Sequence, residues 1–300
     1  MIQIQDVSKH FDEIKAVDHL TLDIPEKEVF GLVGTNGAGK STLLRMIAGI
    51  LRADEGQLLI DGENVYENEA RKADVFYISD EAYLFPNATS LEMMDYYRCM
   101  YTGFDTNKFH ALMKQFGLDE KRRVSTFSKG MRKQLLVILG LCTGTKYLLC
   151  DETFDGLDPV MRQAVKSMIA NEILSRDFTP VIASHNLREL EDLCDRVGLL
   201  HQGGMLLARD LEDMRQQIHK VQCVIRDPEK EKALLSKLEV LTSCHQGALL
   251  VFTARGLREE INASVHEAEP VYSEIVPLSL EEIFISETEV AGYEIKHIIA

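Results

Sequence analysis

Apolar and polar residues alternate along the first 30 residues in the pattern of half-buried β-strands. The alternation is clearest at 2–7 and 20–24, and Pro25 ends the second run. Short apolar runs predict further strands at 29–33, 57–60 and 75–78. The start of the chain is therefore predicted to be β-rich.

The pattern becomes helical between about residues 86 and 146. The sequence Thr89-Ser90-Leu91-Glu92 is a capping box that opens a helix expected to end near Tyr101. Further helices are expected at 106–116 and from Ser128 onward. Strands and helices then alternate, with strands at 147–150, 180–183, 197–200 and 205–208 and helices at 159–175 and after Asn186. This order is typical of an α/β core with an inserted helical block.

The character of the sequence changes after about residue 212. Strands are predicted at 221–226, 239–244, 248–253 and 270–276, with helices at 229–238 and 256–266. This β-α-β-β-α-β order is that of a ferredoxin-like unit, and a capping box at 279–282 opens a last helix. We expect one domain at 1–212, with its helical subdomain at 86–146, and a small α+β domain at 213–300.

Charge and composition exclude several classes of function. The net charge of −15 argues against nucleic acid as a partner, because duplex binding needs a strongly basic face. The six cysteines include no C-x-x-C pair, so no zinc motif is visible. The N-terminus lacks the features of a signal peptide, and the apolar stretch at 135–150 is too short to span a bilayer. A cytoplasmic chain is expected.

Residues 34–42, Gly-Thr-Asn-Gly-Ala-Gly-Lys-Ser-Thr, fit the phosphate-binding loop G-x-x-x-x-G-K-[ST] between a predicted strand and a predicted helix. The glycines allow the backbone to curl around an anion, and the helix N-terminus adds a positive dipole. Lys40 supplies a charge for the β- and γ-phosphates, and the Ser41 hydroxyl is expected to bind Mg²⁺. The expected nucleotide ligands in this loop are Gly34, Asn36, Gly37, Ala38, Gly39, Lys40, Ser41 and Thr42.

Two further sites follow downstream. The strand at 147–150 ends in Asp151, expected to hold Mg²⁺, and Glu152, expected to act as general base on the attacking water. Ser128 and Gly130 stand at the start of a helix, where a hydroxyl, an amide and the helix dipole can bind a second anion.

In this order the motifs resemble the nucleotide-binding domains of ATP-binding cassette (ABC) transporters over residues 1–212. Residues 127–131, Phe-Ser-Lys-Gly-Met, stand where the family signature reads Leu-Ser-Gly-Gly-Gln, a form similar to that of an exporter subgroup. The resemblance implies that Phe11 stacks on adenine, that Asp158 belongs to the D-loop and that His185 contacts the γ-phosphate. Asp80 stands where the family usually has Gln, and it could reach Mg²⁺ through a water.

The resemblance implies an ATPase with ATP and Mg²⁺ as cofactors. The implied catalytic residues are Glu152, His185 and Lys40, and the implied metal ligands are Ser41, Asp80 and Asp151. Two subunits, identical or different, are implied to pack head to tail. Each ATP would then lie between the loop of one subunit and the Ser128 helix of the other.

A separate polytopic membrane permease is implied to dock between Asp80 and the helical block, around residues 83–94. It would hold the chain at the inner face of the membrane, most simply in an exporter. One alternative is a regulatory ABC ATPase that acts on a membrane complex without moving a solute. Another is a soluble ABC ATPase acting on ribosomes or DNA, which is disfavoured because the second cassette or the long coiled coils of such relatives are missing.

Overall fold

The structure is a computed structural model that describes residues 1–300 except 82, 155–156, 158 and 291–300. The chain divides into two compact units, Met1–Ala208 and Arg209–Ala300, which are described separately. The predicted boundary at 212 lies four residues further along, inside the helix α8 (Leu211–Gln217).

The first unit begins with an antiparallel sheet, as the alternating pattern predicts. Its strands are β1 (Ile2–Phe11), β2 (Ile14–Ile24), β4 (Glu55–Ile60) and β5 (Glu63–Asn64), in the order β2-β1-β4-β5. Strand β1 ends later and strand β2 starts earlier than the alternation alone suggests, because both continue to the short turn that joins them as a hairpin.

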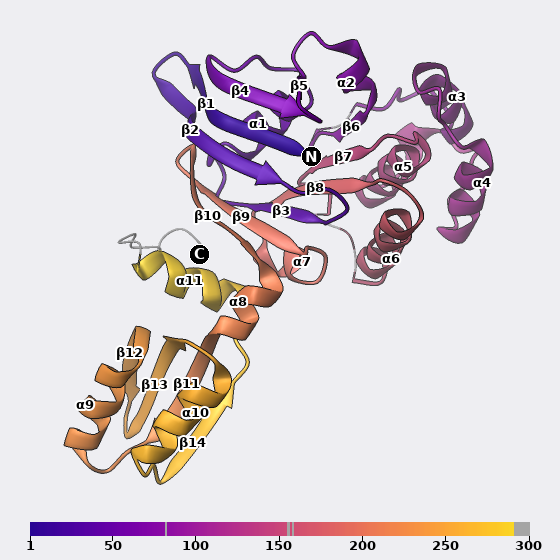
Figure 1. Cartoon of the computed structure of the whole chain (residues 1–300). Helices are drawn as coiled ribbons and strands as arrows, with labels where there is room; N and C mark the ends of the chain where they lie inside the picture. Colours follow the sequence, from indigo (N-terminus) through magenta and orange to yellow (C-terminus); the bar gives the residue numbers. More distant parts are fainter. Residues whose placement is uncertain (82, 155–156, 158, 291–300) are drawn as a thin grey trace. The chain divides into compact units, whose positions relative to one another are not determined.

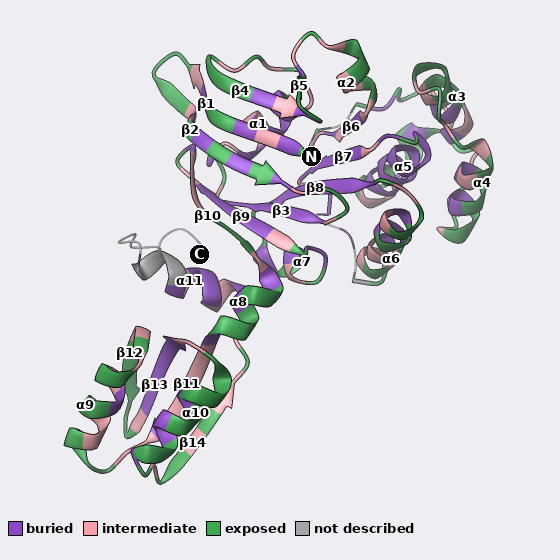
Figure 2. Cartoon of the chain, viewed as in Figure 1, coloured by how far each residue is buried: buried purple, intermediate pink, exposed green. Residues whose placement is uncertain are grey.

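A second, six-stranded sheet carries the functional loops. Its strands are β3 (Phe30–Val33), β6 (Val75–Ile78), β7 (Tyr147–Asp151), β8 (Thr179–Ser184), β9 (Arg196–His201) and β10 (Gly204–Asp210), in the order β10-β9-β3-β8-β7-β6. The pairs β9–β3, β3–β8, β8–β7 and β7–β6 are parallel. Figure 2 shows β3, β7 and β8 buried along their whole length, as expected for central parallel strands.

Helix α1 (Lys40–Ile47) contacts strands of both sheets. Its apolar residues Leu43, Leu44 and Ile47 join side chains from both sheets in one core cluster. This packing fixes the start of α1 at the carboxyl end of β3, where parallel sheets commonly bind ligands.

The helical block contains α3 (Ser90–Met100), α4 (Thr106–Gln115) and α5 (Lys129–Cys142), and α5 packs against β6 (Figure 1). The predicted capping box is present, since the Glu92 carboxylate accepts from Thr89 N at 2.7 Å and Thr89 Oγ1 accepts from Glu92 N at 3.2 Å. The unit also contains α6 (Pro159–Ser175), α7 (Leu187–Glu191) and α2 (Glu69–Ala73), of which α2 was not predicted.

The second unit confirms the ferredoxin-like prediction. After α8, its strands are β11 (Ile218–Val224), β12 (Glu239–Gln246), β13 (Leu249–Arg255) and β14 (Tyr272–Val276), and its helices are α9 (Pro228–Lys237), α10 (Arg258–Glu267) and α11 (Leu280–Val290). The sheet is antiparallel in the order β12-β13-β11-β14, and its core includes Val221, Phe252 and Ile261. Within the described residues of both units, no helix is long and apolar enough to cross a bilayer.

Candidate functional site

The loop between β3 and α1 has the backbone that an anion cradle requires. Gly37 and Gly39 have φ of +81° and +103°, which side-chain-bearing residues rarely adopt. A Cβ on Gly34 would lie 2.4 Å from Leu200 O, and one on Gly39 would lie 2.2 Å from Ala16 O. Gly39 is the N-cap of α1, and no side chain caps this helix end. The amide groups here are therefore suited to an anionic ligand.

The side chain of Lys40 lies inside this loop. It is 5% exposed, and its ammonium donates to Gly34 O at 2.6 Å and to Thr35 O at 3.2 Å. Its Nζ also lies 3.3 Å from Glu152 Oε1. A buried ammonium whose partners in the described part of the chain are two carbonyls and one carboxylate is well placed to meet a second anion.

Asp151, at the end of β7, receives hydrogen bonds on both carboxylate oxygens. Ser41 Oγ donates to Oδ1 at 3.0 Å, and Tyr77 OH donates to Oδ2 at 3.1 Å. Burial raises the pKa of Asp151, and these two hydrogen bonds oppose that rise. The sequence analysis missed Tyr77, whose one signal was a hydroxyl within the apolar strand at 75–78.

Glu152 lies directly beside His185 because β7 and β8 pair in parallel, with Asp151 opposite Ala183. Glu152 Oε2 is 2.8 Å from His185 Nδ1 and also accepts from His185 N at 3.3 Å. The structure thus brings the predicted residues Lys40, Asp151 and Glu152 together with His185 at one edge of the sheet.

Other predicted residues lie elsewhere in the first unit. Phe11 ends β1 with 44% of its surface exposed, and Lys9 Nζ lies 5.6 Å from its ring centroid. Ser128 is the N-cap of α5, where its Oγ accepts from Met131 N at 3.2 Å, and Gly130 lies in the first turn. Asp158 lies outside the described residues.

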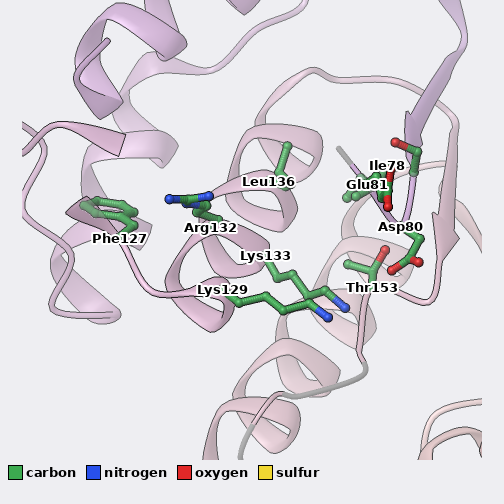
Figure 3. A pocket seen from close by; sticks show the side chains of 10 residues that line it. Ile78, Asp80, Glu81, Phe127, Lys129, Arg132, Lys133, Leu136 and Thr153 are labelled. Atoms are coloured by element: carbon green, nitrogen blue, oxygen red, sulfur yellow. The ribbon is translucent and has the colours of Figure 1, made fainter. Parts of the chain in front are cut away.

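Asp80 lines a cavity of about 330 Å³ between α5 and the segment that follows β6 (Figure 3). Three cations from one face of α5 reach this cavity, Lys129, Arg132 and Lys133, and Thr153 closes another side. No three His, Cys, Asp or Glu side chains in the described parts of the chain form a metal-binding group. The assignment of Asp80 to Mg²⁺ therefore stays a prediction.

Comparison with known proteins decides the family. The ABC transporter family model matches residues 17–155. Over 226 residues the chain is 31% identical to ABC transporter ATP-binding protein NatA of Bacillus subtilis, covering 71% of this chain and 91% of the relative. The chain belongs to the ABC transporter family.

Other relatives of this ABC protein extend the match. It is 29% identical over 286 residues to ABC transporter ATP-binding protein YtrB of Bacillus subtilis, covering 95% of this chain and 97% of the relative, so the match includes the second unit. Bacitracin transport ATP-binding protein BcrA of Bacillus licheniformis is 29% identical over 223 residues, 73% of each chain. A dimeric bacterial ABC transporter cassette shares the fold, with a TM-score of 0.64, 20% identity, and coverage of 70% of this chain and 99% of that one.

The ABC protein is an ATPase subunit whose cofactors are ATP and Mg²⁺. The residues present fit these groups. Gly37 and Gly39 give the loop its left-handed turns, the first turn of α1 has no side-chain cap, and Lys40 supplies a positive charge. The hydroxyl of Ser41 and the carboxylate of Asp151 are hard oxygen donors 3.0 Å apart, a suitable pair for Mg²⁺.

Proposed function

We propose that this ABC ATPase is the ATP-hydrolysing subunit of an exporter. In this proposal two such subunits close around two Mg·ATP and drive a separate membrane permease. The observation that carries the proposal is the convergence of Lys40, Ser41, Asp151, Glu152 and His185 at the carboxyl edge of one parallel sheet.

Each of these residues has a chemical role that its position supports. Backbone amides of the loop and the Lys40 ammonium bind the phosphates, while Ser41 and Asp151 offer oxygens to the metal. The metal, when bound, supplies positive charge beside the β- and γ-phosphates. Glu152 orients a water and accepts its proton, and His185 keeps Oε2 of Glu152 in place while it contacts the γ-phosphate.

The second half of each site comes from another subunit in this proposal. Ser128 and Gly130 begin the fourteen-residue helix α5, whose positive dipole end favours a phosphate. With nucleotide bound, the exposed ring of Phe11 would stack on adenine, Asp158 would serve in the D-loop, and Asp80 would offer its carboxylate to the metal through a water. The dimeric cassette that shares this fold supports such pairing.

An exposed aromatic surface beside the helical block supports the docking of a permease. Tyr83 is 73% exposed, and its ring contacts that of Phe85, which in turn contacts that of Tyr96, with centroids 5.8 and 5.1 Å apart. Grouped exposed apolar side chains commonly mark protein interfaces. Docking there would place the ATPase at the inner face of the membrane. The bacitracin transport relative supports the exporter assignment.

The decisive experiment replaces the proposed general base. We expect Glu152→Gln to lower ATP turnover by roughly 10²–10⁴-fold, since proton transfer is lost, while ATP binding is kept and a closed dimer accumulates. Steady-state hydrolysis, a nucleotide titration and size-exclusion chromatography measure these three effects. Glu269→Gln is the matched control, because this exposed carboxylate pairs with Lys230 in the second unit. Wild-type hydrolysis in Glu152→Gln would remove Glu152 from its role.

A second experiment separates transport from regulation. We expect the chain to co-purify with a polytopic membrane protein. In vesicles, the reconstituted complex should move a solute from the ATPase side of the membrane to the opposite side when ATP is supplied on the ATPase side. A complex that hydrolyses ATP without moving any solute would favour the regulatory ATPase.

A further inference from the structure

The backbone of Glu152 adopts a conformation that needs external support. Its φ of +48° lies in the left-handed region, which costs a non-glycine residue about 1–2 kcal/mol. Such a conformation persists when neighbouring groups hold it. Glu152 N donates to Ala183 O at 3.0 Å, and the carbonyl oxygen of Glu152 accepts from Lys133 Nζ at 2.6 Å.

Lys133 is an unusual residue to find at this place. It lies on α5, is 5% exposed, and crosses from the helix to the residue that follows β7. Figure 3 shows its side chain and that of Lys129 extending from α5 toward Thr153. A buried ammonium is costly unless its donors are satisfied, and an apolar side chain would fill similar space at a lower cost. The hydrogen bond to the carbonyl oxygen of Glu152 compensates part of the cost of burying this charge.

Helix α5 connects this contact to a second one. The helix begins at its N-cap Ser128, and Lys133 lies five residues further along, about 7.5 Å by the helical rise. A regular helix transmits a displacement of one end to the other with little loss. A displacement of the Ser128–Gly130 end would therefore also move Lys133, which contacts the main chain of Glu152.

We propose that Lys133 is a positioning residue for ATP hydrolysis: it holds the main chain of Glu152 and ties this base to the helix end at Ser128. This inference rests on the proposed function, in which the Ser128 end of the helix binds the ATP held by the second subunit. A nucleotide bound at one site then orients the general base of the other.

The first test compares kinetic constants in the full-length protein. We expect Lys133→Met to lower kcat about 10–100-fold, as misplacement of a catalytic group by about 1 Å does, with little change in the KM for ATP. Lys133→Arg keeps a cation and should recover most of the rate. Lys108→Met is the matched control, because Lys108 Nζ also donates to a carbonyl of α5, that of Leu141, at 2.8 Å, but lies away from Glu152.

Several results would overturn the proposal. These are an unchanged kcat in Lys133→Met, a rise in KM without loss of kcat, or an equal loss in Lys108→Met. Thermal unfolding checks that each variant folds. If Lys133→Met does not fold, Lys133→Gln, which keeps a shorter neutral donor, is measured in its place and should show the same loss confined to kcat.

The second test is a double-mutant cycle on kcat with Ser128→Ala and Lys133→Met. The two losses should be less than additive, because either change breaks the same connection. Additive losses would refute the link between the helix end and the base. The proposed function fails separately, if Glu152→Gln hydrolyses ATP normally. A normal Lys133→Met alongside an inactive Glu152→Gln would overturn this inference alone.

Discussion

Removing one hydroxyl tests how the metal-binding carboxylate is held. Burial and the negative charge of Asp151 raise the pKa of Tyr77 to about 12, so its hydroxyl is protonated at neutral pH and donates to Asp151 Oδ2. In Tyr77→Phe this oxygen loses its donor. A hydrogen bond to a charged group contributes about 1.5–3 kcal/mol. For a unit of this size that loss corresponds to a fall in melting temperature of roughly 3–12 °C.

The loss should depend on pH in a defined direction. Burial raises the pKa of Asp151 above its ordinary value of 3.8, so ionised Asp151 lowers the stability of the fold as pH rises through the folded pKa. Tyr77→Phe removes a bond that opposes this rise and so raises the pKa further. The deficit of the variant is therefore full at neutral pH and smaller on the acid side, where Asp151 is protonated in both proteins and only a neutral hydrogen bond is lost.

The assay is thermal unfolding of the nucleotide-free protein, repeated with saturating Mg·ATP. We expect the deficit to shrink with Mg·ATP, because a cation beside Asp151 replaces the lost donor. Tyr101→Phe is the matched control, since its hydroxyl donates over 3.4 Å to the uncharged carbonyl of Val75, and it should cost less than about 1 kcal/mol. Equal shifts in the two variants would refute the reasoning about Asp151. An unchanged deficit with Mg·ATP would separate Asp151 from the metal.

Three further substitutions test other parts of the fold. Gly39→Ala should abolish nucleotide binding in a titration, because the new Cβ would lie 2.2 Å from a main-chain carbonyl oxygen. A Cβ on Gly37 would have no atom within 4 Å, so Gly37→Ala should only weaken binding. Burial opposes ionisation of Asp61, but hydrogen bonds led by that of Lys146 hold its pKa below the ordinary value. Asp61→Asn should therefore lose roughly 1.5–3 kcal/mol at neutral pH. This loss should begin to shrink below about pH 4 and fade only as the pH approaches the lowered pKa of folded Asp61, as denaturant unfolding would show. Phe252→Ala, at a position 1% exposed, should cost the second unit about 3–5 kcal/mol, and a loss below about 1 kcal/mol would contradict this core assignment.

Elements with strong local signals were predictable from the sequence. The buried parallel strands appear as short apolar runs, and the capping boxes at Thr89 and Ser279 both form in the structure. The short helices α2 and α8 have weaker signals: each has one N-cap side chain, Asn68 or Asp210, and no capping box. No residue of α2 is buried, so its sequence has no apolar face, while α8 depends on the cap by Asp210 and on burial of Leu211 and Met214.

The same limit applies to the site. Lys40 and Ser41 belong to one contiguous motif, and Asp151 and Glu152 to another, so local spacing was enough to find them. Tyr77 and Lys133 act on residues 74 and 19 positions away. Those contacts exist because β6 pairs with β7 and α5 packs against β6. The periodicity of apolar residues along the chain does not predict which elements become neighbours.

The cavity beside α5 gives a physical reason for an aspartate at position 80. With a neutral glutamine, the usual residue of the family at this position, Glu81 would supply the negative charge on that wall without the help of residue 80. Asp80 and Glu81 line the wall opposite α5, and the side chains of Lys129 and Lys133 extend toward the side of Asp80 and Thr153 (Figure 3). Opposite charges attract more strongly in a partly enclosed cavity than across open water. The carboxylate of Asp80 therefore adds negative charge to a cavity that the cations of α5 also line, whether or not Asp80 also reaches the metal through a water.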